Sequence, residues 1–112
     1  MSEVKEILEH AKPYEDRTEY IVVSMGAKGV VGISKEGNYH VIPPKIKVRS
    51  SLGAGDSLVA GIVFAFSKGG TFEDALVLGV ACGTASTLNP GSDLCTKNDL
   101  EMIKKDVHFE KI

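Results

Sequence analysis

Hydrophobic residues change their spacing about halfway along the chain. In the first half they form short runs that are separated by glycine, proline and charged residues, as in a protein rich in sheet. The run over residues 20–25 is continuous and β-branched, which is typical of a strand that is buried on both faces. The pattern predicts a helix over 3–12 and strands over 20–25, 30–34, 39–43 and 45–48.

The second half is predicted to be helical and unusually apolar. Residues 56–67 and 72–87 form two helices in this prediction, and Thr71 with Asp74 provides a reciprocal cap at the start of the second. A short last helix begins after Thr96. Helices that are apolar on all sides need cover on more than one side, and the chain has few residues left to supply it. We therefore expect a part of a larger fold or one subunit of an oligomer.

Composition limits the function without defining it. The chain has 112 residues, of which 43% are hydrophobic and 25% charged, as in a globular protein with one modest core. The net charge of −2 and the broken apolar runs argue against a partner that is nucleic acid or membrane. Cys82 and Cys95 lack metal-site spacing, so we expect reduced thiols and a cytoplasmic location. We expect His10 and His40 to face solvent.

The junction between the two halves carries the strongest chemical signal. Gly53, Ala54 and Gly55 are small enough for a ligand to approach the backbone, and the helix that begins at about Asp56 offers free N–H groups to an anion such as phosphate. The Asp56 carboxylate would repel that phosphate, but it can accept the proton of a hydroxyl that attacks it. The alternative, an N-cap on a tight strand–helix turn, stays open at this point.

A second glycine-containing segment lies at residues 24–29, where Gly26 and Gly29 flank the end of a strand. This spacing is compatible with a plain hairpin turn and with one wall of a nucleotide site. Neither glycine segment is a Walker A loop, because no Gly-Lys-Ser/Thr follows, and neither is a good G-x-G-x-x-G fingerprint.

Residues 50–58, Ser-Ser-Leu-Gly-Ala-Gly-Asp-Ser-Leu, resemble the second signature of the PfkB (ribokinase-like) carbohydrate kinases, D-T-x-G-A-G-D-x-F. The Ser-Ser pair replaces Asp-Thr, as in the phosphosugar-kinase branch. Residues 22–34 resemble the family's S-x-G-x-x-G nucleotide segment, and residues 81–95 resemble its late helix and loop near the adenine. The resemblance implies an α/β fold, namely the C-terminal part of a Rossmann-like α/β/α architecture, with a β-rich first half and buried helices after it.

The resemblance also implies a reaction and its residues. The reaction is ATP-dependent phosphorylation of a sugar phosphate, of the fructose-6-phosphate, fructose-1-phosphate or tagatose-6-phosphate type, with Mg²⁺ on the nucleotide. Asp56 would be the catalytic base, and Gly53, Ala54 and Gly55 would form the anion hole. Further residues would line the nucleotide site: Ser24, Gly26, Ala27, Gly29, Gly55 and Asn89. A K⁺ site would be formed by Ser50, Leu52, Ser86, Asn89 and Gly91.

The resemblance covers only part of the family's pattern. The N-terminal sugar-binding and lid portion and the N-x-x-E-type metal motif have no counterpart in the sequence. We therefore expect one partial domain over 1–112, the nucleotide-binding C-terminal portion, which forms a homo-oligomer or lacks its N-terminal portion. Three interpretations stay open: a kinase portion that is incompetent alone, a nucleotide-binding fragment without catalysis, and a structural fragment that needs a partner.

Overall fold

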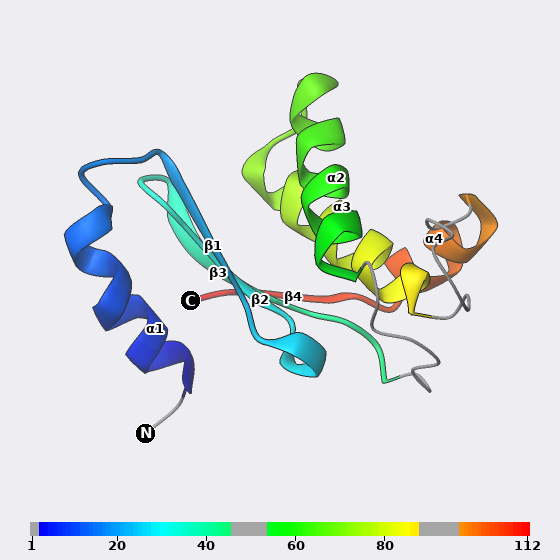
Figure 1. Cartoon of the computed structure of the whole chain (residues 1–112), viewed down its shortest axis with the longest axis horizontal. Helices are drawn as coiled ribbons and strands as arrows, with labels where there is room; N and C mark the ends of the chain where they lie inside the picture. The colour runs from blue at the N-terminus through cyan, green and yellow to red at the C-terminus, as the bar shows by residue number, and fades with distance from the viewer. Residues whose placement is uncertain (1–2, 46–53, 88–96) are drawn as a thin grey trace.

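The computed structural model describes residues 3–45, 54–87 and 97–112 (Figure 1). Most of the predicted strand 45–48, the loop 89–93 and the cap at Thr96 lie outside the described residues. In chain order the elements are α1 (Glu3–Ala11), the 3₁₀ turn η1 (Lys12–Tyr14), β1 (Tyr20–Ser24), the 3₁₀ turn η2 (Gly26–Lys28), β2 (Val30–Ser34), β3 (Gly37–Ile42), α2 (Ala54–Ser67), α3 (Phe72–Ser86), α4 (Lys97–Lys104) and β4 (His108–Lys111).

The described sheet is an antiparallel meander with the order β1-β2-β3-β4. Short turns join the first three strands, as the glycine and charged residues between them predict. The last strand was not predicted from the sequence. It pairs with β3, so that His40 lies opposite Glu110 and Tyr39 lies opposite Lys111.

The sheet is covered by helices on both faces, which gives three layers and confirms the expected α/β architecture (Figure 1). On one face α1 packs against β2, and the buried side chains there are Ala11, Val31 and Ile33. On the other face α3 packs against β2 and β3, with α2 packed on α3; the buried side chains there are Val30, Tyr39, Val41, Phe72, Leu76 and Val80.

The strand that is buried on both faces is β2, and the prediction that β1 would be such a strand is wrong. All of β2 except Ser34 is buried, whereas both ends of β1 are exposed and its middle is only half-buried. Since β1 is an edge strand of the described sheet, its continuous apolar run has a neighbouring strand on one side only.

The two long helices cross where both carry glycine. A Cβ atom on Gly61 would lie 2.9 Å from the Cα of Gly79, and a Cβ on Gly79 would lie 2.9 Å from the Leu58 carbonyl oxygen. The two glycines therefore permit the close approach of α2 and α3. Thr71 and Asp74 also cap α3 as predicted, because each side chain accepts a hydrogen bond of 3.1 Å from the other residue's backbone N–H.

The two helices differ in how completely they are covered. α3 buries residues around most of its circumference, as expected. The outer face of α2 is open, since Val59, Val63 and Phe64 are 59%, 60% and 56% exposed. The prediction that residues 56–67 form a buried helix is therefore wrong for one face of α2 within the described part of the chain.

Candidate functional site

The N-terminus of α2 holds the first group of predicted site residues. The helix begins at Ala54, two residues earlier than expected, so Gly55 and Asp56 lie inside its first turn. This excludes the N-cap interpretation of Asp56, because a cap precedes the first helical residue. Asp56 and Gly55 are both exposed to solvent. A carboxylate in the first turn interacts favourably with the positive end of the helix dipole.

Ser57 was not recognised from the sequence. Its side chain is only 2% exposed, and its Oγ is the one fully buried side-chain oxygen or nitrogen without a hydrogen-bond partner that is found among the described residues. A buried hydroxyl without a partner costs about 1–3 kcal/mol. Its signal in the sequence was a serine directly after Asp56 in an otherwise apolar helix. The first turn of α2 therefore contains one exposed carboxylate and one unsatisfied hydroxyl.

Residues 24–29 form the connection of the β1–β2 hairpin, as the simpler interpretation predicts. The turn is closed by hydrogen bonds from the Met25 N–H to the Gly29 oxygen (2.7 Å) and from the Gly29 N–H to the Gly26 oxygen (3.0 Å). Gly26 and Gly29 have φ values of 61° and 93°, which favour glycine at both positions. The backbone of this turn is therefore held by its own hydrogen bonds, and Gly26 is exposed.

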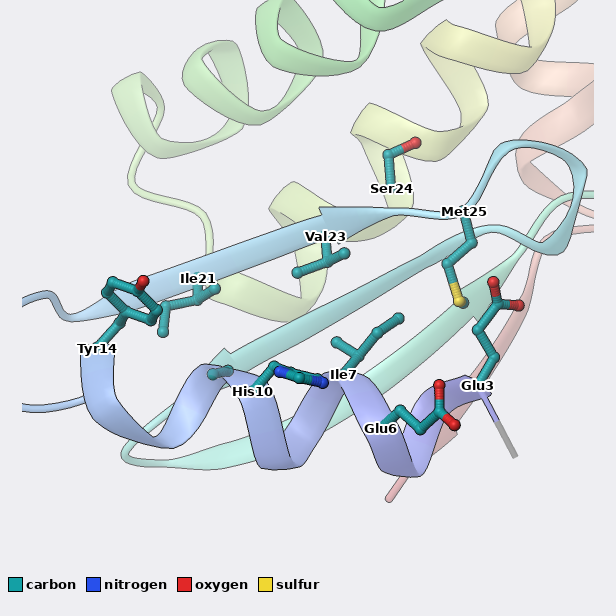
Figure 2. Close-up of a pocket in the computed structure, with 10 residues that line it drawn as sticks. Glu3, Glu6, Ile7, His10, Tyr14, Ile21, Val23, Ser24 and Met25 are labelled. Atoms are coloured by element: carbon teal, nitrogen blue, oxygen red, sulfur yellow. The ribbon is translucent and has the colours of Figure 1, made fainter. Parts of the chain in front are cut away.

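The side chains around this turn point in different directions. Figure 2 shows Ser24 projecting from β1 toward the helices, while Val23 and Met25 project toward α1. Ser24 thus lies on the face of the sheet that carries α2. A mostly apolar hollow of about 490 Å³ lies on the other face of β1, between that strand and α1, and its lining includes Ile7, Ile21 and Val23.

The predicted cation residues are mostly untested. Ser50, Leu52, Asn89 and Gly91 lie outside the described residues, as does Gly53 of the predicted anion hole. Ser86 is buried, and its Oγ donates a 2.8 Å hydrogen bond to the Gly83 oxygen within α3. Within residues 3–45, 54–87 and 97–112 no group of three His, Cys, Asp or Glu side chains is arranged to hold a metal ion, and no helix is long and apolar enough to span a membrane.

Histidine placement departs from the sequence prediction at one position. His10 is exposed, as expected. His40 is not: its side chain is only 16% exposed, and its Nε2 lies 3.0 Å from the carbonyl oxygen of Lys28 in the η2 turn. The alternation of the strand pointed to solvent, but α1 and the η2 turn cover that face of β3. His40 is thus a second residue, after Ser57, whose environment was not predicted from the sequence.

Comparisons with known proteins confirm the resemblance. The family described as pfkB family carbohydrate kinase matches residues 2–99. The chain is 39% identical over 83 residues to ATP-dependent 6-phosphofructokinase isozyme 2 of Escherichia coli (strain K12), covering 74% of this chain and 27% of that protein. It is 38% identical over 99 residues to 1-phosphofructokinase of Borreliella burgdorferi, covering 88% of this chain and 32% of that protein.

Solved structures agree with the sequence comparison. The crystal structure of phosphofructokinase-2 from Escherichia coli in complex with potassium matches with a TM-score of 0.86 at 31% identity, covering 94% of this chain and 35% of that chain. A tetrameric inhibited form of phosphofructokinase-2 from the same organism matches with a TM-score of 0.81 at 28% identity, covering 94% and 34%. This chain spans between 27% and 35% of the length of these relatives. It belongs to the pfkB family of carbohydrate kinases.

Proposed function

We propose that this chain is the nucleotide-binding, C-terminal portion of an ATP-dependent phosphosugar kinase. The observation that carries the proposal is the first turn of α2, where an exposed carboxylate directly follows a run of small residues. Relatives named 6-phosphofructokinase and 1-phosphofructokinase support the same reaction class. The acceptor is a sugar phosphate of the fructose-6-phosphate, fructose-1-phosphate or tagatose-6-phosphate type.

In this proposal Asp56 accepts the proton of the attacking sugar hydroxyl. Its exposure in the first turn of α2 leaves the carboxylate open to a second substrate. Free N–H groups at the start of the helix, next to Gly53, Ala54 and Gly55, stabilise the negative charge on the transferred phosphoryl group. The Ser57 hydroxyl, which lacks a partner, fits a site where a polar ligand group completes the hydrogen bonding.

The nucleotide is held by the 24–29 turn together with Gly55 and Asn89. Ser24 projects toward the helices (Figure 2), and the turn contributes backbone groups of Gly26, which is exposed, and of Ala27. Mg²⁺ enters bound to the phosphates of the nucleotide, the ligands that it commonly uses in phosphoryl-transfer sites. K⁺ is proposed for the carbonyl groups of Ser50 and Leu52, with Ser86, Asn89 and Gly91 nearby, and a potassium complex is known for one similar structure.

A second candidate function is nucleotide binding without catalysis. It is favoured by the open apolar face of α2 and by the share of its relatives that the chain spans. In this version the acceptor sugar is bound by a homo-oligomeric partner or by an N-terminal portion outside this sequence. We place either form in the cytoplasm, consistent with its ATP substrate.

Thermal melting with Mg-ATP, with and without K⁺, tests binding. A ligand present at about 100 times its Kd stabilises the protein that binds it by ~2.7 kcal/mol. For a domain of this size, that raises the melting temperature by roughly 10 °C or more. No shift in an otherwise cooperative melt would reject nucleotide binding by this chain. Turnover is then assayed with fructose 6-phosphate, fructose 1-phosphate and tagatose 6-phosphate. Asp56→Asn should keep the melting shift and lose turnover, since it removes only the proton acceptor.

A further inference from the structure

We propose that His40 is a positioning residue that holds the 26–29 turn in shape for the nucleotide. This inference rests on the proposed function, because it assigns a role toward the same site. It concerns a residue outside the glycine segments, 12 positions from the carbonyl that it contacts.

The contact has a defined polarity. A carbonyl oxygen can only accept a hydrogen bond, so the Nε2 of His40, 3.0 Å from the Lys28 oxygen, must carry the proton and donate. The Nδ1 of the same ring lies 3.9 Å from Oε2 of Glu110 on the adjacent strand β4. The imidazole therefore lies between the turn and a carboxylate.

The Lys28 carbonyl lies in a part of the turn that packing alone does not hold. At one end Gly29 is buried against β3, where even a Cβ atom would lie 2.9 Å from the Cα of Ile42. At the other end Gly26 has open space beside it. The Lys28 carbonyl lies between these two ends, so its hydrogen bond to His40 restrains the part of the turn that packing leaves free.

A second interaction at Lys28, an ion pair, is weaker than the hydrogen bond to His40. Its Nζ lies 3.1 Å from Oε2 of Glu3, but these side chains are 74% and 51% exposed, and exposed ion pairs contribute little. Lys28 and His40 also line a hollow of about 410 Å³ together with Met25 and Ile42.

The restraint acts from behind the proposed nucleotide site. His40 belongs to the face of β3 that also carries Asn38 and Ile42, whereas Tyr39 and Val41 point into the core beneath α3. Ser24 projects toward the helices (Figure 2). His40 therefore shapes the turn without occupying the space that the nucleotide would use. Without His40, the free energy needed to order the turn would weaken nucleotide binding.

The test compares His40→Leu, His40→Gln and a control, His108→Leu. Leucine fills similar space without a donor, whereas the glutamine amide can still donate to the Lys28 carbonyl. His108 also pairs with Glu110, at 3.1 Å, but it is exposed and does not contact the turn. Two quantities are measured in each variant: hydrogen exchange of the Met25 and Gly29 amides by NMR, and the Kd of Mg-ATP by calorimetry.

The expected result is a selective change. His40→Leu should raise both exchange rates and the Kd roughly 3- to 10-fold, the effect of one net hydrogen bond, while His40→Gln and His108→Leu stay near wild type. Three results would overturn the proposal: unchanged exchange in His40→Leu, exchange raised equally across the β2–β3 ladder, or raised exchange with an unchanged Kd. If the wild-type chain does not bind Mg-ATP, nucleotide binding by this chain is rejected, and the exchange data alone decide whether His40 holds the turn.

Discussion

Replacing Gly29 with alanine should destabilise the protein far more than replacing Gly26, although both glycines belong to the same turn. Gly26, at φ 61°, lies in the left-handed helical region with nothing within 4 Å of a built Cβ, so alanine there costs about 1–2 kcal/mol. Gly29 has φ 93° and ψ −148°, a combination that L-residues rarely adopt. A Cβ there would also lie 2.9 Å from backbone atoms of both Val41 and Ile42.

The clash at Gly29 cannot be relieved by a side-chain rotation, because the atoms it meets belong to the β3 backbone. Backbone strain and overpacking together predict a loss of about 2–6 kcal/mol for Gly29→Ala. Urea unfolding followed by circular dichroism measures this loss, with Gly26→Ala as the matched control and the m-value as a check on two-state behaviour. If the two variants unfold within ~0.5 kcal/mol of each other, the close packing of the turn against β3 is wrong.

Three further changes test packing, capping and ionisation. Leu76→Ala removes a fully buried side chain under the sheet and should lower the free energy of unfolding by about 2–5 kcal/mol in urea titrations; a loss under ~1 kcal/mol would contradict the α3–sheet contact. Thr71→Ala removes the cap of α3 and should cost about 1 kcal/mol, whereas Thr71→Ser should cost little. Burial, with a smaller contribution from Glu73, raises the pKa of Tyr39 above 10.0. Its contribution to stability is thus present below pH 10.0 and lost as pH rises further, so Tyr39→Phe should flatten the alkaline fall in melting temperature, and an identical fall in both proteins would contradict this.

The local features that were predicted from the sequence are those whose cause is local. The capping pair at Thr71 and Asp74 needs only three residues of spacing, and it forms as expected. The hairpin strands follow from short apolar runs between turn residues. The family could be recognised because its signature is long and continuous in sequence.

The features that were missed depend on distant parts of the chain. β4 is a four-residue strand with three exposed residues, and only its pairing with β3 makes it a strand. His40 looks like an outward residue of an alternating strand until the η2 turn and α1 cover it. Ser57 looks like an ordinary helix residue, yet in the fold its hydroxyl is buried and has no hydrogen-bond partner among the described residues. In each case the determining contact is tertiary, and no spacing rule contains it.

The 24–29 turn and α2 differ in how many contacts within the chain support them, and this difference affects what the chain can do. The 24–29 turn is held by its own hydrogen bonds, by the packing of Gly29 on β3 and by His40, all within the described residues. α2 is held on one side only, because Val63 and Phe64 leave its outer face uncovered. Binding through the turn therefore depends on contacts that this chain supplies itself. Proton transfer at Asp56 needs α2 to stay rigid with an acceptor sugar in place, and neither condition is met by the described residues alone. We therefore expect nucleotide binding to survive in the isolated chain more readily than catalysis.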